Sequence, residues 1–248
     1  MEHHYQYKAA FYKEGRQGYA PEAVQLITET IGTPRAVIAD MGSGTGIFSA
    51  SLLKKGCVVY CVEPDADLRQ KASERLRHFK HFMPIAAPAE DTRLPNHSVD
   101  GITAASAFHW FDPEIFLREC KRIIKPDSPV FFLYNVRPND DPFSQEQSRV
   151  CRQYCPGFTS FCHGADKAKK RCPAFFSDEF KEKHYSYDLI YTKEQFLSRC
   201  LSSSYSLNQT QPDYPAYRRE LEKLIASYSI DGLITIRNYT VVWYGMIK

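Results

Sequence analysis

The chain has 248 residues, of which 43% are hydrophobic and 25% charged, and its formal net charge is +3. This composition is typical of a globular chain with one large domain, or of a core with a smaller lid, and the lack of internal repeats excludes a repeat protein. The near balance of 32 basic and 29 acidic residues gives no support for a nucleic-acid partner, and no apolar stretch approaches the roughly 20 residues that span a bilayer. We therefore expect a monomer or weak dimer that acts on a small molecule, without membrane contact. Because the start lacks the apolar core of a signal peptide, we also expect a cytoplasmic location.

Strand and helix patterns alternate through residues 33–136. The strand "AVIAD" is followed by a glycine-rich loop and a helical pattern, and "CVVYCVEP" is followed by the helical stretch "DADLRQKASERLRHF". The strand-like "DGITAASAFHWF" then precedes the helical "PEIFLRECKRII", and "SPVFFLYNV" closes the series. Such alternation predicts a parallel sheet with helices on both faces, with ligands bound beyond the carboxyl ends of its strands.

The alternation stops after Asn135. Residues 137–180 have no strand pattern and are too long for a connecting loop, so we expect a helical insertion, with a second one at 193–229. Residues 181–192 and 230–248 are rich in aromatic and β-branched residues, which predicts closing strands. The basic run within the first insertion favours a solvated face, although it could attract an anionic substrate.

The cysteine pattern indicates neither a disulfide framework nor a metal site. With no export signal among the residues, the eight thiols are expected to be reduced, and Cys57 and Cys61 to be buried apolar residues. Four others do not follow the tight paired spacing of zinc sites, so no metal is expected there: Cys151, Cys155, Cys162 and Cys172.

Three glycines, Gly42, Gly44 and Gly46, follow the first strand in alternation, which suggests that a ligand approaches the backbone closely. A dinucleotide fingerprint would need glycine where Ile47 stands, and the phosphate-loop motif is absent. Glu63 ends the second strand, where a carboxylate can accept hydrogen bonds from both hydroxyls of a ribose.

The pattern acidic-x-G-x-G-x-G, which begins at Asp40, resembles the first motif of the class I S-adenosylmethionine-dependent methyltransferases. The stretches "AAFYKEGRQGYAPEAV", "SAFHWFD" and "LSSSYS" further resemble small-molecule members of methyltransferase type 11, similar to trans-aconitate methyltransferase. The resemblance implies a Rossmann-like α/β fold: a doubly wound, mostly parallel seven-stranded sheet with a helical lid inserted after the fifth strand. It also implies a single methyltransferase domain over 1–248, in which 1–32 cover the cofactor, 33–136 bind it, and the two insertions set substrate specificity.

The resemblance also implies the cofactor, S-adenosyl-L-methionine, with S-adenosyl-L-homocysteine as product. Gln17 and Ala20 depart from the family pattern in the cover, which weakens the expected turn there. The implied cofactor-binding residues are Tyr12, Arg16, Asp40, Gly42, Ser43, Gly44, Thr45, Gly46, Glu63, Pro64, Ala89, Glu90 and Ser106.

His109 is the catalytic candidate, because imidazole titrates near neutral pH and the residue follows the fourth strand. It could serve as a general base or as a substrate hydrogen-bond partner, or its ring could tie the loop to the backbone. An aromatic substrate pocket could be lined by Tyr5, Trp110, Tyr134 and Tyr205.

The predicted activity is methyl transfer to a small-molecule acceptor by in-line displacement, and a carboxylic acid is one candidate acceptor. Two alternatives stay open: a catalytically silent S-adenosylmethionine-binding protein and a nicotinamide-dependent oxidoreductase.

Overall fold

The computed structural model describes residues 18–177 and 180–248. Tyr5, Tyr12 and Arg16 lie outside the described residues. The described chain, which we expected to be one domain, forms two compact units. We call residues 18–135, 164–186 and 240–248 the sheet unit, and residues 136–163 and 187–239 the helical unit.

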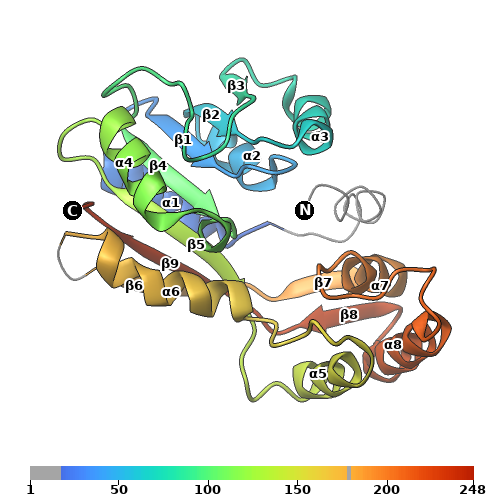
Figure 1. Cartoon of the computed structure of the whole chain (residues 1–248). Helices are drawn as coiled ribbons and strands as arrows, with labels where there is room; N and C mark the ends of the chain where they lie inside the picture. Colours follow the sequence, from blue (N-terminus) through green and yellow to red (C-terminus); the bar gives the residue numbers. More distant parts are fainter. Residues whose placement is uncertain (1–17, 178–179) are drawn as a thin grey trace. The chain divides into compact units, whose positions relative to one another are not determined.

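A seven-stranded sheet forms the sheet unit, with the strand order β3-β2-β1-β4-β5-β9-β6 (Figure 1). β1 pairs in parallel with β2 and β4, β2 with β3, and β4 with β5. The predicted mostly parallel, seven-stranded α/β sheet is therefore confirmed. The strands are β1 (Val37–Met41), β2 (Val58–Val62), β3 (Phe82–Ile85), β4 (Gly101–Ala105), β5 (Val130–Val136), β6 (Lys181–Ser186) and β9 (Tyr239–Gly245).

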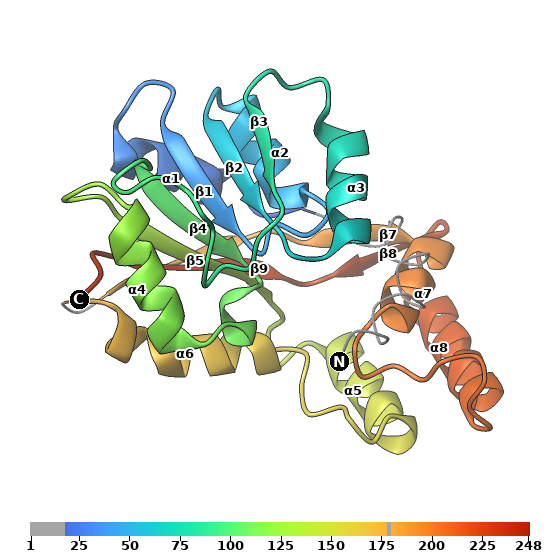
Figure 2. The same cartoon turned by 45° about the horizontal axis from the view of Figure 1, so that its top comes forward.

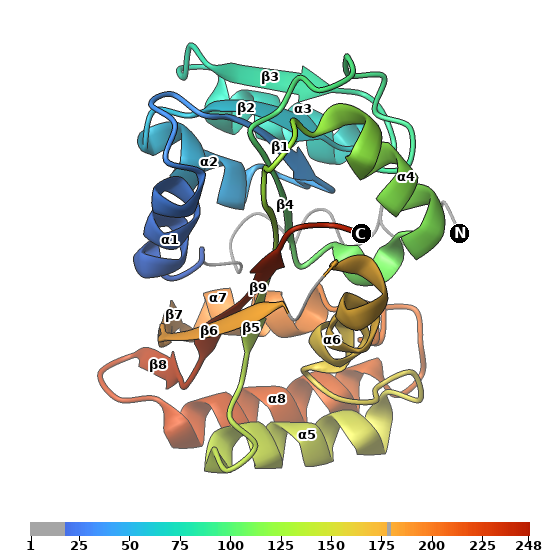
Figure 3. The ribbon, with the colours of Figure 1, turned by 90° about the vertical axis from the view of Figure 1, so that its left-hand side faces the viewer.

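Helices cover both faces of this sheet: α1 and α2 lie on one face, and α4 and α6 on the other (Figure 3). Local sequence explains where they begin. Asp65 caps α3 by accepting the N–H of Leu68, and Asp112 caps α4 by accepting two backbone N–H groups, with Pro113 in the first turn. The helices are α1 (Pro21–Ile31), α2 (Ile47–Lys54), α3 (Ala66–Leu76), α4 (Pro113–Ile123) and α6 (His163–Phe175).

The strand order reverses beside β1, which lies between β2 and β4 (Figure 2). In open parallel sheets the loops on either side of such a reversal leave a crevice for ligands at the carboxyl ends. The register places Asp40 of β1 opposite Cys61 of β2 and Thr103 of β4. The loops that follow β1 and β4 therefore start side by side.

Several boundaries differ from the prediction. Residues 21–31 of the expected cover form α1, whose apolar face (Ala23, Val24, Ile27) is buried in the sheet unit. The short strand β3 was not predicted, because Pro84 interrupts its pattern.

The expected insertion 137–180 is divided between the two units, with α5 (Pro142–Tyr154) in the helical unit and α6 in the sheet unit. Phe175 gives the reason: its ring centroid lies 5.3 Å from that of Phe108, 5.6 Å from Phe116 and 5.0 Å from Phe132. The aromatic end of α6 thus belongs to the core of the sheet unit rather than to a lid.

The expected closing strand at 181–192 is two strands in different sheets. β6 joins the seven-stranded sheet, whereas β7 (Leu189–Thr192) pairs antiparallel with β8 (Leu233–Ile236) in the helical unit. Leu189 and Tyr191 of β7 are buried while Ile190 is exposed, so β7 covers the core of the helical unit with one face.

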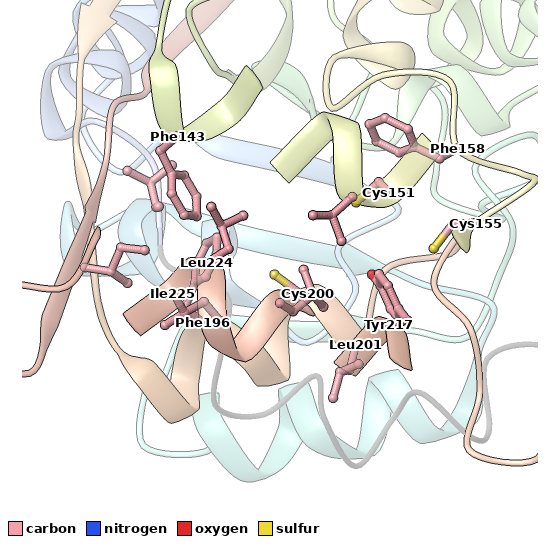
Figure 4. Packing of buried hydrophobic residues seen from close by; sticks show 14 of the residues in the cluster. Phe143, Cys151, Cys155, Phe158, Phe196, Cys200, Leu201, Tyr217, Leu224 and Ile225 are labelled. Atoms are coloured by element: carbon pink, nitrogen blue, oxygen red, sulfur yellow. The ribbon is translucent and has the colours of Figure 1, made fainter. Parts of the chain in front are cut away.

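The helical unit has its own hydrophobic core, built from α5, α7 (Lys193–Leu201), α8 (Tyr214–Tyr228) and the β7–β8 pair. Figure 4 shows the rings of Phe143, Phe196 and Tyr217 in this core together with Cys151, Cys155 and Cys200. Cys172 instead is buried in the sheet unit. Across residues 18–177 and 180–248, no group of three or more His, Cys, Asp or Glu side chains could hold a metal ion. None of the helices described there is long and apolar enough to cross a membrane.

Candidate functional site

The glycine loop after β1 needs its glycines for two reasons. Gly42, Gly44 and Gly46 have φ of +65°, +56° and +74°, in the left-handed region that L side chains avoid. A Cβ at Gly42 would lie 2.8 Å from the Cβ of Ala107, and one at Gly46 would lie 2.6 Å from Cδ1 of Leu76. The loop therefore packs directly on the segment after β4 and on α3.

Glu63, at the end of β2, is bound to this loop. One carboxylate oxygen accepts the N–H of Gly44 at 2.9 Å and the other accepts the N–H of Asp65 at 3.0 Å. Burial raises the pKa of Glu63 above its ordinary value. Arg69, which the sequence analysis did not single out, donates to the carbonyl oxygens of Glu63 and Pro64 at 2.9 and 2.6 Å, and so holds the chain that carries the carboxylate.

Asp40 lies beneath the loop and is fully buried. Its carboxylate accepts hydrogen bonds from Ser49 Oγ at 2.5 Å and from Thr103 Oγ1 at 2.9 Å. Burial raises the pKa of Asp40 to about 6 in spite of these hydrogen bonds. Because it has no exposed surface, Asp40 supports the loop rather than presenting its carboxylate to a ligand.

The loop also contains an unsatisfied polar group. Within the described part of the chain, the buried hydroxyl of Ser43 has no hydrogen-bond partner. Buried polar groups are normally paired, so an unpaired hydroxyl in a glycine loop fits a site that a ligand completes. Thr45 and Ala89 are buried, whereas Pro64 is exposed next to Glu63.

Ser106, directly after β4, has a φ of +55°, which is unusual for a residue other than glycine. Its hydroxyl accepts a hydrogen bond from Tyr19 Oη at 3.0 Å. The ring of Tyr19 meets that of Phe48 edge-on, with centroids 5.2 Å apart. Tyr19 lies in the stretch "GRQGYAPEAV", which is part of the segment that resembles the family, but the sequence analysis did not select it as a site residue. Glu90 accepts the N–H of Asp112 at 3.0 Å and thereby braces the segment that follows.

His109 is held by Tyr134 of β5. The hydroxyl of Tyr134 accepts the backbone N–H of His109 at 3.1 Å and lies 3.0 Å from its ring Nδ1. Burial raises the pKa of Tyr134 well above its ordinary value, so the hydroxyl keeps its proton. The two contacts hold the turn and the imidazole ring of His109 in place.

Arg171 of α6 braces the same turn by donating from Nη1 to the carbonyl oxygens of Phe108, His109 and Phe111 at 3.0 to 3.4 Å. The sequence analysis treated Arg171 as part of a solvated basic run. Its neighbour Lys169 fits that expectation better, because its ion pair with Glu182 is half-exposed. Trp110 is 61% exposed, which leaves its ring available to a ligand.

The sheet unit thus brings together most of the predicted residues on the loops that follow β1, β2 and β4: the glycine loop, Glu63, Ser106 and His109. Tyr205 instead belongs to the helical unit, where its ring packs on Phe158 with centroids 4.8 Å apart. A separate hollow of about 240 Å³ is lined by Pro129, Phe176 and Tyr244. Since Pro129 precedes β5, this hollow lies at the amino end of that strand and not at the predicted site.

Comparison with known proteins agrees with this geometry. Residues 39–132 match the family model described as "Methyltransferase domain". An uncharacterized methyltransferase of Mycobacterium tuberculosis is 29% identical over 126 residues, which cover 51% of this chain and 49% of the relative. An uncharacterized methyltransferase of Schizosaccharomyces pombe is 22% identical over 209 residues, which cover 81% of this chain and 78% of that protein. The chain thus spans about half the length of the mycobacterial relative.

The fold has solved counterparts. A protein of Anaeromyxobacter dehalogenans, described as a "Putative Type II Methyltransferase", superposes with a TM-score of 0.70 at 21% identity and covers 93% of this chain and 97% of its own. The YcgJ protein of Bacillus subtilis superposes with a TM-score of 0.54 at 16% identity, covering 92% and 99%. The chain therefore has the Rossmann-like fold of these methyltransferases, and its residues 39–132 match the methyltransferase domain model.

Proposed function

We propose that this protein transfers a methyl group from S-adenosylmethionine to a small-molecule acceptor by in-line displacement. The observation that carries the proposal is the junction between the glycine loop and Glu63, where the Gly44 N–H meets the Glu63 carboxylate at the point where the strand order reverses. A ribose diol suits the two oxygens of Glu63, and a methionine end suits the loop amides and the unpaired Ser43 hydroxyl. When bound, S-adenosylmethionine would supply a methyl group that its sulfonium charge has already activated.

The protein's own contribution is then alignment and exclusion of water, which can supply a large part of the catalysis. Tyr134 and Arg171 hold the turn that carries His109 in one conformation. If the Tyr134 hydroxyl donates its proton to Nδ1, the imidazole proton lies on Nε2, and His109 would donate a hydrogen bond to an acceptor rather than remove a proton from it. This assignment favours an acceptor that is already ionised, such as a carboxylate, over an amine or a phenol.

Acceptor specificity is assigned to the two predicted insertions, residues 137–180 and 193–229, because the loops after the first strands are assigned to the cofactor. The silent-binding alternative would keep the Glu63 site and lack turnover. A nicotinamide oxidoreductase is disfavoured because Ile47 replaces the third glycine of its fingerprint.

Calorimetry with S-adenosylhomocysteine tests the proposal directly. Glu63→Ala should weaken binding by about 1 to 3 kcal/mol, the scale of hydrogen bonds to a charged group. Glu74→Ala, which removes an exposed carboxylate from α3, is the matched control and should leave the affinity unchanged. Unchanged affinity in Glu63→Ala, or binding of a nicotinamide nucleotide in place of S-adenosylhomocysteine, would refute the proposal.

A further inference from the structure

Arg137, the first residue after β5, is a buried cation in the helical unit with only 8% of its surface exposed. Its Nη1 donates to Oε1 of Gln147 at 2.6 Å, and this is the only hydrogen bond that its guanidinium makes within the described residues. The guanidinium carbon lies 4.5 Å from the ring centroid of Phe161 and 5.7 Å from that of Phe196. We call Arg137, Gln147, Phe161, Phe196 and Arg199 the Arg137 cluster.

Arg199 of α7 brings a second positive charge to this cluster. Its Nε is buried and has no hydrogen-bond partner in the part of the chain that the structure describes. The pKa of Arg137 is lowered, first by burial and then by repulsion from Arg199. Among the residues described, no carboxylate lies within ion-pair distance of either arginine.

The sheet unit shows how the same chain treats an arginine with a structural role. Arg122 forms two hydrogen bonds to the buried carboxylate of Glu119, at 2.8 and 2.7 Å, and a third to the carbonyl oxygen of Leu94. A buried charge without a counter-ion is costly, and structural charges are normally paired in this way. Two neighbouring arginines without a carboxylate therefore point to a missing anion.

We propose that Arg137 and Arg199 bind the oxyanion, a carboxylate or a phosphate, of a small molecule. Guanidinium groups present paired N–H donors that match the oxygens of both anions. The side-chain N–H of Gln147 donates to Cys200 Sγ at 3.1 Å, which restricts rotation of the Gln147 amide. Gln147 therefore fixes the orientation of Arg137. The rings of Phe161 and Phe196 suit an apolar or unsaturated body attached to the anion. The ring of Tyr205, a predicted substrate residue, has its centroid 6.4 Å from that of Phe161.

Thermal melting of the full chain tests this site with fumarate, benzoate and inorganic phosphate, each against sodium chloride at equal ionic strength. An anion at a hundredfold excess over its Kd should raise the Tm of the wild type by roughly 5 °C or more. Fumarate or benzoate acting alone assigns a carboxylate, and phosphate acting alone assigns a phosphate. Arg137→Met should lose this shift and should melt at the same temperature as the wild type or higher when no anion is added, since it removes an uncompensated buried charge.

Arg199→Met, at a half-buried position, is the second test variant and should also lose the shift, whereas Arg152→Met, on the exposed face of α5, should keep it. Equal shifts in all variants would reveal a general salt effect and overturn the proposal. No anion shift in the wild type, together with a lowered Tm in Arg137→Met, would make Arg137 structural and overturn it as well. Calorimetry with S-adenosylhomocysteine separates the two proposals: no S-adenosylhomocysteine binding by the wild type refutes the methyltransferase proposal, and no anion-dependent Tm shift in the wild type refutes this one.

Discussion

The two units differ in how their buried charged groups are compensated. In the sheet unit each buried carboxylate of the site, Asp40 and Glu63, accepts hydrogen bonds from neutral donors of the same unit. In the helical unit the buried Asp141 likewise accepts the N–H of Ser144, but the buried guanidinium of Arg137 has only one amide and two aromatic rings beside it among the described residues, and no carboxylate. Within the described residues, the carboxylates of the first site have hydrogen-bond partners and the Ser43 hydroxyl has none, whereas Arg137 has no counter-ion.

The largest effect should come from a side chain that the backbone conformation of the glycine loop cannot accommodate. Gly42→Ala forces a side chain to a φ of +65° and places its Cβ 2.8 Å from that of Ala107, so unfolding free energy should fall by about 2 to 5 kcal/mol. Gly56→Ala is the control, because Gly56 also has a positive φ but no atom within 4 Å of the added Cβ, and it should cost about 1 to 2 kcal/mol. Urea unfolding followed by tryptophan fluorescence reports on the sheet unit, which contains both tryptophans, Trp110 and Trp243. Equal losses in both variants would show that the packing against Ala107 is unimportant.

Asp40→Asn tests whether the buried, charged carboxylate of Asp40 lowers the free energy of unfolding as much as its raised pKa implies. The pKa rises from 3.8 to about 6 on folding, so stability from this group is fully present below pH 3.8 and is lost as the pH rises through 6. The loss in the wild type should be about 2 kcal/mol between pH 4.5 and pH 7, and Asp40→Asn should remove that pH dependence. Glu74→Gln, at an exposed position, should keep the wild-type profile. A profile for Asp40→Asn that matches the wild type would mean that Asp40 is charged in both states across this range.

Tyr134→Phe tests the brace on His109. It leaves the backbone N–H of His109 without its acceptor, and we expect a loss of about 1 to 2 kcal/mol in unfolding free energy. Tyr60→Phe, on β2, is the control and should be close to neutral. If turnover is measured, Tyr134→Phe should lower kcat more than it changes S-adenosylhomocysteine affinity, because the hydroxyl orients His109 and not the cofactor loop. A loss of cofactor affinity that matches the loss of kcat would contradict this role.

Ser43→Ala should have the smallest effect on stability. It tests whether the unpaired Ser43 hydroxyl serves ligand binding or folding. Because the Ser43 hydroxyl has no partner in the described structure, its removal should change the free energy of unfolding by less than about 1 kcal/mol. S-adenosylhomocysteine should nevertheless bind more weakly, by about 1 kcal/mol, if the ligand supplies the missing partner. Weaker folding with unchanged binding would show that the hydroxyl serves the protein and not the ligand.

Sequence alone predicted which residues the sheet unit brings together at the candidate site, because the parts of that site are local. The glycines and Glu63 each follow a strand directly, and strand ends in a parallel sheet must meet at one edge. The alternating pattern also predicted the order of elements from β1 to β5, apart from the short strand β3. The local signal was weaker for Tyr19, which needs a partner 87 residues away, and for Arg171, whose acceptors lie about 60 residues before it.

Local pattern therefore determined the class of fold, the glycine loop and the acidic strand end, because strand periodicity and glycine conformation are properties of neighbouring residues. Tertiary structure alone decided which unit each later segment joins: Phe175 draws α6 to the sheet, and β7 leaves β6 to pair with β8. It alone also decided the environment of Arg137, whose neighbours Gln147, Phe161 and Arg199 come from segments up to 62 residues apart in the chain. The charge of a buried arginine is compensated or not according to what packs around it, and no stretch of sequence contains that packing.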